Sequence, residues 1–319
     1  MASPGIATMK AIDCSQIADW SQEIGWDVDY QQVGRGAFDG RFSTAYCGDM
    51  RITRQFCNRA LEARGVPPHG MMSVLLPLPG KNQTFIQGRA LGENKAAVMA
   101  ASSEGLLRSP RDLRMYTVSV PQAQLESALW DYGRCELASL LSDCGVTSFP
   151  REVIQNLTEV LNAVTCPTFE MKGEVAQLEA EDQILQTICE GFFSQEYKVA
   201  RRKRTKYVFL ARAYIDAHLN NVLRVGQIAS NVGVSGRTLE LAFREVVGLR
   251  VVEYIRTRRL SRARQLLLKQ PVNDKPITEA ATQCGLFHLG YFSRDYGRLF
   301  GELPSQTVKR ADSRRAQLS

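Results

Sequence analysis

A pattern of small and apolar residues occurs twice in the second half of the chain, and it constrains the fold more than any other feature. In each copy an Ala stands four residues before a Gly. Two large apolar residues spaced by four follow, and another Gly closes the copy five residues later. The positions are Ala229, Gly233, Leu239, Phe243 and Gly248 in the first copy, and Ala281, Gly285, Phe292, Tyr296 and Gly301 in the second.

This spacing is typical of a helix-turn-helix unit. The small Ala lets the first helix approach the second, and the Gly permits a tight turn that a side chain would obstruct. Residues spaced by four share one face of the second helix, so they pack inward. The closing Gly predicts a helix end. The aromatic residues of the stretch 284–301 are therefore predicted to be core, and the opposite face of each second helix remains available to a DNA groove.

The exposed faces carry residue types that read base edges. Arg bonds guanine through two hydrogen bonds, and apolar side chains contact the thymine methyl group. Gly290 and Gly297 leave room for DNA to come close. An Arg on a single such helix is more often an ordinary solvated charge, but two such helices in a repeat within a basic segment favour DNA. The predicted DNA-contact residues are Arg237, Thr238, Glu240, Leu241 and Arg244 in the first copy, and His288, Leu289, Gly290, Ser293 and Arg294 in the second.

A helix is predicted between the two copies, over residues 250–270. Eighteen helical residues span about 27 Å, and successive major grooves on one face of DNA lie about 34 Å apart. A helix of comparable length is therefore suited to hold two recognition helices in adjacent grooves. Its apolar stripe is predicted at Val252, Ile255, Leu260, Ala263 and Leu267, and phosphate contacts are predicted from Arg256, Arg258 and Arg259.

The net charge differs between the two halves of the chain, with the boundary near residue 200. Residues 201–319 hold 23 Lys and Arg against 9 Asp and Glu, a net charge of +14. Residues 1–200 hold 17 against 24, a net charge of −7. A basic module on an acidic one indicates a polyanionic partner for the basic part. The run Tyr197–Tyr207 holds six basic residues and reads either as a solvated linker or as a phosphate contact.

The first half is predicted to be a β-rich unit followed by amphipathic helices. Strands are expected in six short runs with β-branched and aromatic content. Helices are expected over 121–133, 150–164 and 174–193, and the last is a candidate dimerisation element. Its predicted apolar face is Leu178, Leu185 and Ile188. The strand segments are 42–47, 50–56, 71–78, 83–88, 95–100 and 114–120.

The two units and their joining helix, with "YIRTRRLSRARQLL" and "YFSRDY", resemble the AraC/XylS family of bacterial transcription regulators over about 207–310. Tyr296 stands where the family usually has Phe, and Thr307 where it often has Tyr. Within the family, "VSGRTLELAF" and "FDGRFSTAYCGDMRITRQF" are similar to the ethanolamine-operon regulator subgroup. The resemblance implies an α+β chain, with a cupin-like (AraC-binding-like) N-terminal domain and an all-α C-terminal domain.

We therefore expect an effector-sensing and dimerisation domain at 1–196, a basic linker at 197–206, a DNA-binding domain at 207–312 and a tail at 313–319. The expected function is sequence-specific regulation, most often activation in this family. The expected partners are double-stranded promoter DNA, RNA polymerase and a second copy of the chain. The effector is unknown. The resemblance to the ethanolamine-operon regulator subgroup suggests ethanolamine with adenosylcobalamin. Arg41, Arg51, Arg54, Tyr46 and Arg89 either line a barrel or face water.

Other classes of protein are less well supported by the residues. Eight Cys form no CxxC pair, so buried reduced thiols are expected, with a redox sensor as the alternative. Three distant His do not predict a metal site. A cupin-like enzyme fused to a DNA-binding domain and an architectural DNA protein remain alternatives to a regulator. The lack of a signal peptide or an apolar span leads us to expect a cytoplasmic protein without a membrane partner.

Overall fold

The computed structural model describes residues 6–80, 83–101, 103–131, 145–166, 174–193, 203–269 and 276–318. The chain divides into two compact units, one drawn from the first 200 residues and the other holding 201–319 with the short segments 31–38 and 59–62. Within the described part, no helix combines the length and the hydropathy that crossing a membrane requires. Residues 197–202 of the expected linker lie outside the described residues.

The strands form two sheets, with β1-β3-β4-β11-β6-β9-β12 in one and β2-β5-β10-β7-β8 in the other. Neighbours in the larger sheet run antiparallel, as where Val118 pairs with Ile52 on one side and Val74 on the other. The bounds are β1 Ala7–Ala11, β2 Asp27–Gln32, β3 Gly40–Cys47, β4 Met50–Cys57, β5 Leu61–Val66, β6 Met71–Pro77, β7 Thr84–Ile86, β8 Arg89–Leu91, β9 Lys95–Met99, β10 Gly105–Arg108, β11 Leu113–Pro121 and β12 Gly145–Ser148.

All six predicted strands are confirmed, as β3, β4, β6, β7, β9 and β11. The prediction missed β1, β2, β5, β8, β10 and β12. Several of these are short or rich in charged residues, such as β2 with the sequence DVDYQQ. Helix α1 (Cys14–Glu23) was also missed, although Asp13 caps it by accepting hydrogen bonds from the backbone amides of Ser15 and Gln16.

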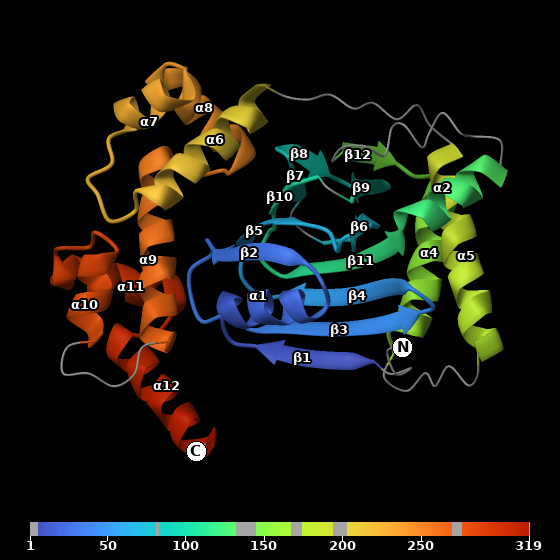
Figure 1. Ribbon diagram of the computed structural model, residues 1–319, viewed down its shortest axis with the longest axis horizontal. Helices are drawn as coiled ribbons and strands as arrows, with labels where there is room; N and C mark the ends of the chain where they lie inside the picture. The colour runs from blue at the N-terminus through green and yellow to red at the C-terminus, as the bar shows by residue number, and fades with distance from the viewer. Residues whose placement is uncertain are drawn as a thin grey trace. The chain divides into compact units, whose positions relative to one another are not determined.

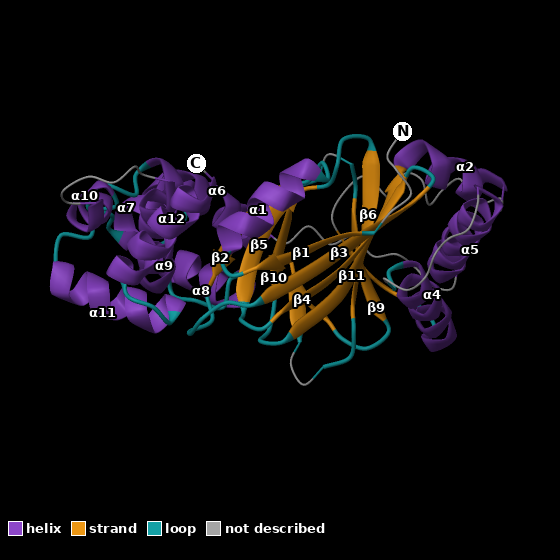
Figure 2. Cartoon of the chain, turned by 90° about the horizontal axis from the view of Figure 1, so that it is seen from below, coloured by secondary structure: helices purple, strands orange, loops and turns teal. Residues whose placement is uncertain are grey.

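Helices α2 (Gln122–Asp131), α4 (Arg151–Val164) and α5 (Glu174–Phe193) cover one face of the larger sheet. Figure 2 shows these three helices together on one side of the strands. Leu157 and Leu161 of α4 are buried there, and so is Ile188 of α5, as predicted for that helix. The predicted face of α5 is wrong at its start, because Leu178 is 57% exposed and Ile184 is buried instead.

The helical unit contains seven helices among the residues described. They are α6 (Lys203–Ala217), α7 (Val225–Val232), α8 (Gly236–Val246), α9 (Val251–Lys269), α10 (Pro276–Gln283), α11 (Leu289–Phe300) and α12 (Pro304–Leu318). Figure 1 shows α7 and α8 near one end of α9, and α10 and α11 further along it. The segment expected as a tail is helical to Leu318.

Both repeats fold as the pattern predicts. Ala229 and Ala281 are buried. Gly233 and Gly285 occupy the left-handed region, with φ of +76° and +70°. A residue other than Gly is strained in that region. The predicted core pairs Leu239 with Phe243 and Phe292 with Tyr296 are all buried.

The joining helix α9 differs from the prediction in two places. Val252 is 61% exposed, and the neighbouring Val251 and Tyr254 are buried instead. Arg264 is also buried, although the apolar stripe predicted for this helix does not include it. It is buried because Glu302, from the loop between α11 and α12, supplies a carboxylate 2.8 Å away.

A candidate nucleic-acid interface

The first recognition helix is α8, and its geometry follows from one cap and one apolar face. The Ser235 side chain caps the helix by accepting a hydrogen bond from the Thr238 amide at 3.1 Å. The Ser235 and Thr238 hydroxyls are also hydrogen bonded, at 2.9 Å. Leu239, Ala242, Phe243 and Val246 are buried. The opposite face exposes Arg237, Leu241 and Arg244, while Thr238 and Glu240 are half-buried beside them.

The second recognition helix is α11, and its inner face is formed by Phe292, Tyr296, Leu299 and Phe300. His288 stands at the N-cap position, and Gly301 ends the helix in the left-handed conformation. Four of the predicted contact residues are exposed, and Ser293 is half-buried. The four are His288, Leu289, Gly290 and Arg294.

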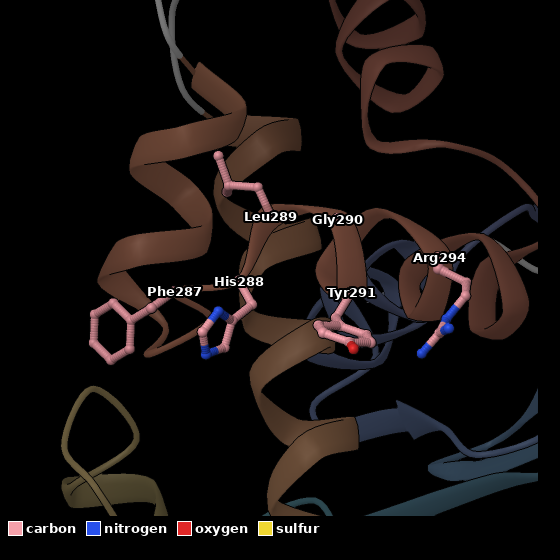
Figure 3. Close-up of a pocket in the computed structure, with 6 residues that line it drawn as sticks. All are labelled: Phe287, His288, Leu289, Gly290, Tyr291 and Arg294. Carbon is pink, nitrogen blue, oxygen red and sulfur yellow. The ribbon is translucent and has the colours of Figure 1, made fainter.

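Two aromatic residues at the start of α11 contradict the prediction that this stretch is core. Phe287 is 61% exposed and Tyr291 is 60% exposed. They line a shallow open pocket together with His288, Leu289, Gly290 and Arg294. Figure 3 shows the rings of Phe287, His288 and Tyr291 on one side of the helix start, whereas Leu289 projects to the other side.

The charged and aromatic groups of this pocket contact one another. The Arg294 guanidinium lies 4.8 Å from the centre of the Tyr291 ring, a distance at which a cation is attracted to the ring face. The His288 ring meets Tyr291 edge-on, with 6.3 Å between ring centres. Three side chains thus form one continuous surface at the helix start.

The two glycines of α11 differ in their surroundings. A Cβ added at Gly290 would meet nothing within 4 Å, so the space beside it is open. A Cβ added at Gly297 would lie 3.6 Å from the side chain of Leu303. The interpretation that both glycines make room for DNA is therefore retained for Gly290 only, since Gly297 faces the loop that follows α11.

The three arginines of α9 that were predicted to contact phosphate have different environments. Arg256 is half-exposed and pairs with Asp295 of α11. Arg258 is largely buried and donates to Asp216 of α6 at 2.8 Å. Arg259 donates to the carbonyl oxygens of Leu219 and Asn221 in the turn that follows α6, and its burial lowers the pKa of its guanidinium.

A buried polar network holds α11 against α9 and α12. Glu302 lies 2.8 Å from Arg264 and 2.8 Å from Arg310, and it accepts a hydrogen bond from the Thr307 hydroxyl at 2.7 Å. The Thr307 and Tyr296 hydroxyls are 2.8 Å apart. Burial raises the pKa of Tyr296 to about 12, so its hydroxyl stays neutral in this network.

Four of the described cysteines are buried thiols with raised pKa values. Burial raises the pKa of Cys47 and Cys284 to about 11 and that of Cys57 and Cys189 to about 12. Thiols with raised pKa are poor nucleophiles. Cys135 and Cys144 lie outside the described residues. Among the residues that are described, no group of three His, Cys, Asp or Glu is placed to hold a metal ion.

Comparison with known proteins places the helical unit in a family. Residues 228–310 match the family model of a helix-turn-helix domain. The chain is 35% identical over 111 residues to the XylDLEGF operon transcriptional activator 2 of Pseudomonas putida, and the match covers 33% of this chain and 71% of that protein. The chain belongs to the AraC/XylS family of transcription regulators.

Two further comparisons cover different shares of the matched protein. The chain is 35% identical over 102 residues to the probable thc operon regulatory protein of Rhodococcus erythropolis, which is 32% of this chain and 31% of that protein. The match thus spans less than a third of that relative. The AraC-like transcriptional activator CuxR is 18% identical, with a TM-score of 0.45, over 87% of this chain and 100% of that one.

Proposed function

We propose that this chain is a sequence-specific DNA-binding transcription regulator, and that it acts as an activator. The observation that carries the proposal is the pair of recognition helices, α8 and α11. Each buries its apolar face and exposes residue types that read bases. Arg237, Leu241 and Arg244 belong to the first helix, and Gly290 and Arg294 to the second. The helices enter adjacent major grooves, because α9, with its 19 residues, spans about 28 Å between them.

Affinity comes from the net charge of the basic half together with selected phosphate contacts. Arg256 is the best placed arginine of α9 for this role, since its side chain is half-exposed. Arg258 and Arg259 are engaged in internal contacts, so we assign them to holding α9 against α6. Thr238 and Glu240 flank the exposed face of α8 and are proposed as minor contacts, as is Ser293 in α11.

Residues 1–196 are proposed to sense a small molecule and to form a homodimer, and residues 207–312 to bind DNA. The exposed Trp130 of α2 and Leu178 of α5 support a dimer surface, because large apolar side chains are costly to leave in water. Analytical ultracentrifugation of Leu178→Glu tests this, and an unchanged oligomeric state would contradict it. RNA polymerase is the proposed partner for activation.

The effector is the least constrained part of the proposal. The resemblance to the ethanolamine-operon subgroup makes ethanolamine with adenosylcobalamin the first pair to test. Isothermal titration calorimetry of the full chain with each compound, separately and together, measures whether the compounds bind. If no heat of binding is measured with either compound alone or with both together, this effector is removed from the proposal. The DNA-binding role is not affected by that result.

The central experiment is binding of the full chain to promoter DNA across a salt series. DNA upstream of its own gene and of neighbouring operons is compared with scrambled DNA. A regulator protects discrete sites in footprinting and binds them more tightly than scrambled DNA. Uniform protection with steep salt dependence would favour an architectural protein instead. An Arg294→Ala variant is expected to lose about 1–3 kcal/mol of binding free energy on the specific site.

A further inference from the structure

The two recognition helices present unlike side chains at equivalent positions of the repeat. The alignment places Gly290 opposite Arg237, Tyr291 opposite Thr238 and Arg294 opposite Leu241. The first helix therefore surrounds an aliphatic residue with cations, whereas the second places one cation beside an aromatic ring. Two helices that differ in this way are suited to different base sequences, so the two halves of the DNA site are expected to differ.

The exposed surface at the start of α11 is aromatic and cationic. Phe287 and Tyr291 are each about three-fifths exposed, and the Arg294 guanidinium lies 4.8 Å from the Tyr291 ring centre. None of the six residues that line the pocket carries a carboxylate. The neighbouring Asp295 is largely buried; it pairs with Arg256 and also lies 3.9 Å from Nε of Arg294. The surface is thus apolar and positively charged, which matches a DNA groove.

A thymine followed by guanine fits this surface. In the major groove thymine presents a methyl group, and guanine presents the acceptors O6 and N7 that Arg bonds in pairs. Successive bases of one strand are about 3.4 Å apart along the axis, so a ring and a guanidinium 4.8 Å apart can each face one of two neighbouring bases. The open space at Gly290 allows the base edges to reach the ring.

We propose that the second unit recognises a thymine–guanine step, an inference that rests on the proposed DNA-binding function. The Tyr291 ring packs on the thymine methyl group, and Phe287 extends this apolar contact. Arg294, held over the same ring, donates to O6 and N7 of the adjacent guanine. Tyr291 and Arg294 are thus specificity-determining residues, and Tyr291 is one that the sequence pattern assigned to the core.

The test begins with selection of binding sites from random 30-base-pair duplexes by the full-length protein. Wild type is compared with Tyr291→Ser, Arg294→Lys and, as a control in the first unit, Arg237→Lys. The Tyr291→Ser variant is expected to lose a thymine preference at one position, and Arg294→Lys a guanine preference at the next. Arg237→Lys alters a position about one helical turn away. Because all three side chains are exposed, the variants are expected to melt like wild type.

A second measurement isolates the methyl group. Replacing the selected thymine by deoxyuridine removes only that group, so wild-type Kd is expected to rise about fourfold, the effect of leaving one methyl unburied. The Tyr291→Ser variant is expected to bind both duplexes equally. An unchanged wild-type Kd, or the same fourfold loss in the variant, would overturn the thymine contact while the regulator proposal stands.

Two further outcomes separate this inference from the proposed function. If the wild type enriches no sequence at all, the DNA-reading function itself fails. If Tyr291→Ser retains every base preference but activates transcription less, the aromatic surface binds a protein, and the thymine–guanine assignment is wrong.

Discussion

The Arg264 guanidinium lies 2.8 Å from the Glu302 carboxylate, although the Arg264 side chain is only 8% exposed. The same guanidinium lies 4.5 Å from the centre of the Phe300 ring. A charge held this deeply depends on its partner, because removing one member of a buried pair leaves the other uncompensated. This pair joins α9 to the end of the second recognition helix.

Glu302→Gln is therefore expected to destabilise the protein by about 3 kcal/mol, the effect of leaving a buried charge unpaired. The double variant Arg264→Met with Glu302→Gln should recover most of that loss, since the buried Arg264 charge is removed and Arg310, which also loses its carboxylate, is partly exposed. Urea unfolding followed by circular dichroism measures both. Equal stability of the Glu302→Gln variant and wild type would mean that the pair does not hold this junction together.

The turn glycines of the two repeats form a matched pair of tests. Gly233→Ala and Gly285→Ala both force a side chain into the left-handed region, which costs about 1–2 kcal/mol. Gly285→Ala should cost more, because its Cβ would lie 3.0 Å from the Leu219 carbonyl oxygen and 3.2 Å from Arg259, whereas Gly233 faces open space. Thermal melting gives the order, and a larger loss at Gly233 would contradict it.

The arginines of α9 are expected to divide into two classes. Arg256→Ala should reduce the slope of log affinity against log salt by about 0.9, the effect of one lost phosphate contact. Arg258→Ala should leave that slope unchanged and lower stability instead, because its ion pair with Asp216 is internal. Arg151→Ala, an exposed arginine of α4, serves as the control. A reduced slope for Arg258→Ala would reverse the assignment.

Cys284 is expected to resist alkylation at neutral pH. Its pKa is raised from 9.0 to about 11 by burial, so roughly a hundredfold fewer thiolates are present than for an ordinary thiol. In the folded protein the rate of labelling should become substantial only as the pH approaches 11. In urea, where the thiol is exposed, labelling should already be fast at neutral pH. Iodoacetamide labelling with peptide mass spectrometry measures this site alone. Rapid labelling of the folded protein at pH 7 would favour the redox-sensor alternative.

The sequence predicted the helical unit well because its signals are local. Ala229, Gly233 and Phe243 lie within one repeat, and their spacing alone predicts the two helices and their turn. The six predicted strands are likewise short runs with a strong composition. The strands that were missed either have few residues or, like β2, carry several charges, so their formation depends on pairing with distant strands.

Side-chain burial was predicted less well, and each error has a physical reason. Arg264 is buried because Glu302, distant in sequence, neutralises it, and no local pattern indicates that partner. Phe287 and Tyr291 were assigned to the core because the inward packing argued for Phe292 and Tyr296 was extended to every aromatic residue of the stretch. The helical period separates Tyr291 from Phe292 by about 100°, so applying that period would have placed Tyr291 on the exposed side.

The joining helix contains neither Gly nor Pro between Val251 and Lys269, so it has no residue at which to bend or rewind. Inserting one residue would turn the second unit by about 100° and move it by about 1.5 Å relative to the first. One added base pair in the operator would likewise turn the second half-site by about 35°. If the protein binds as proposed, its promoters are free to vary at bases that the two units do not contact, but not in the spacing between half-sites. A regulon controlled by this chain should therefore be searchable by spacing first and by sequence second.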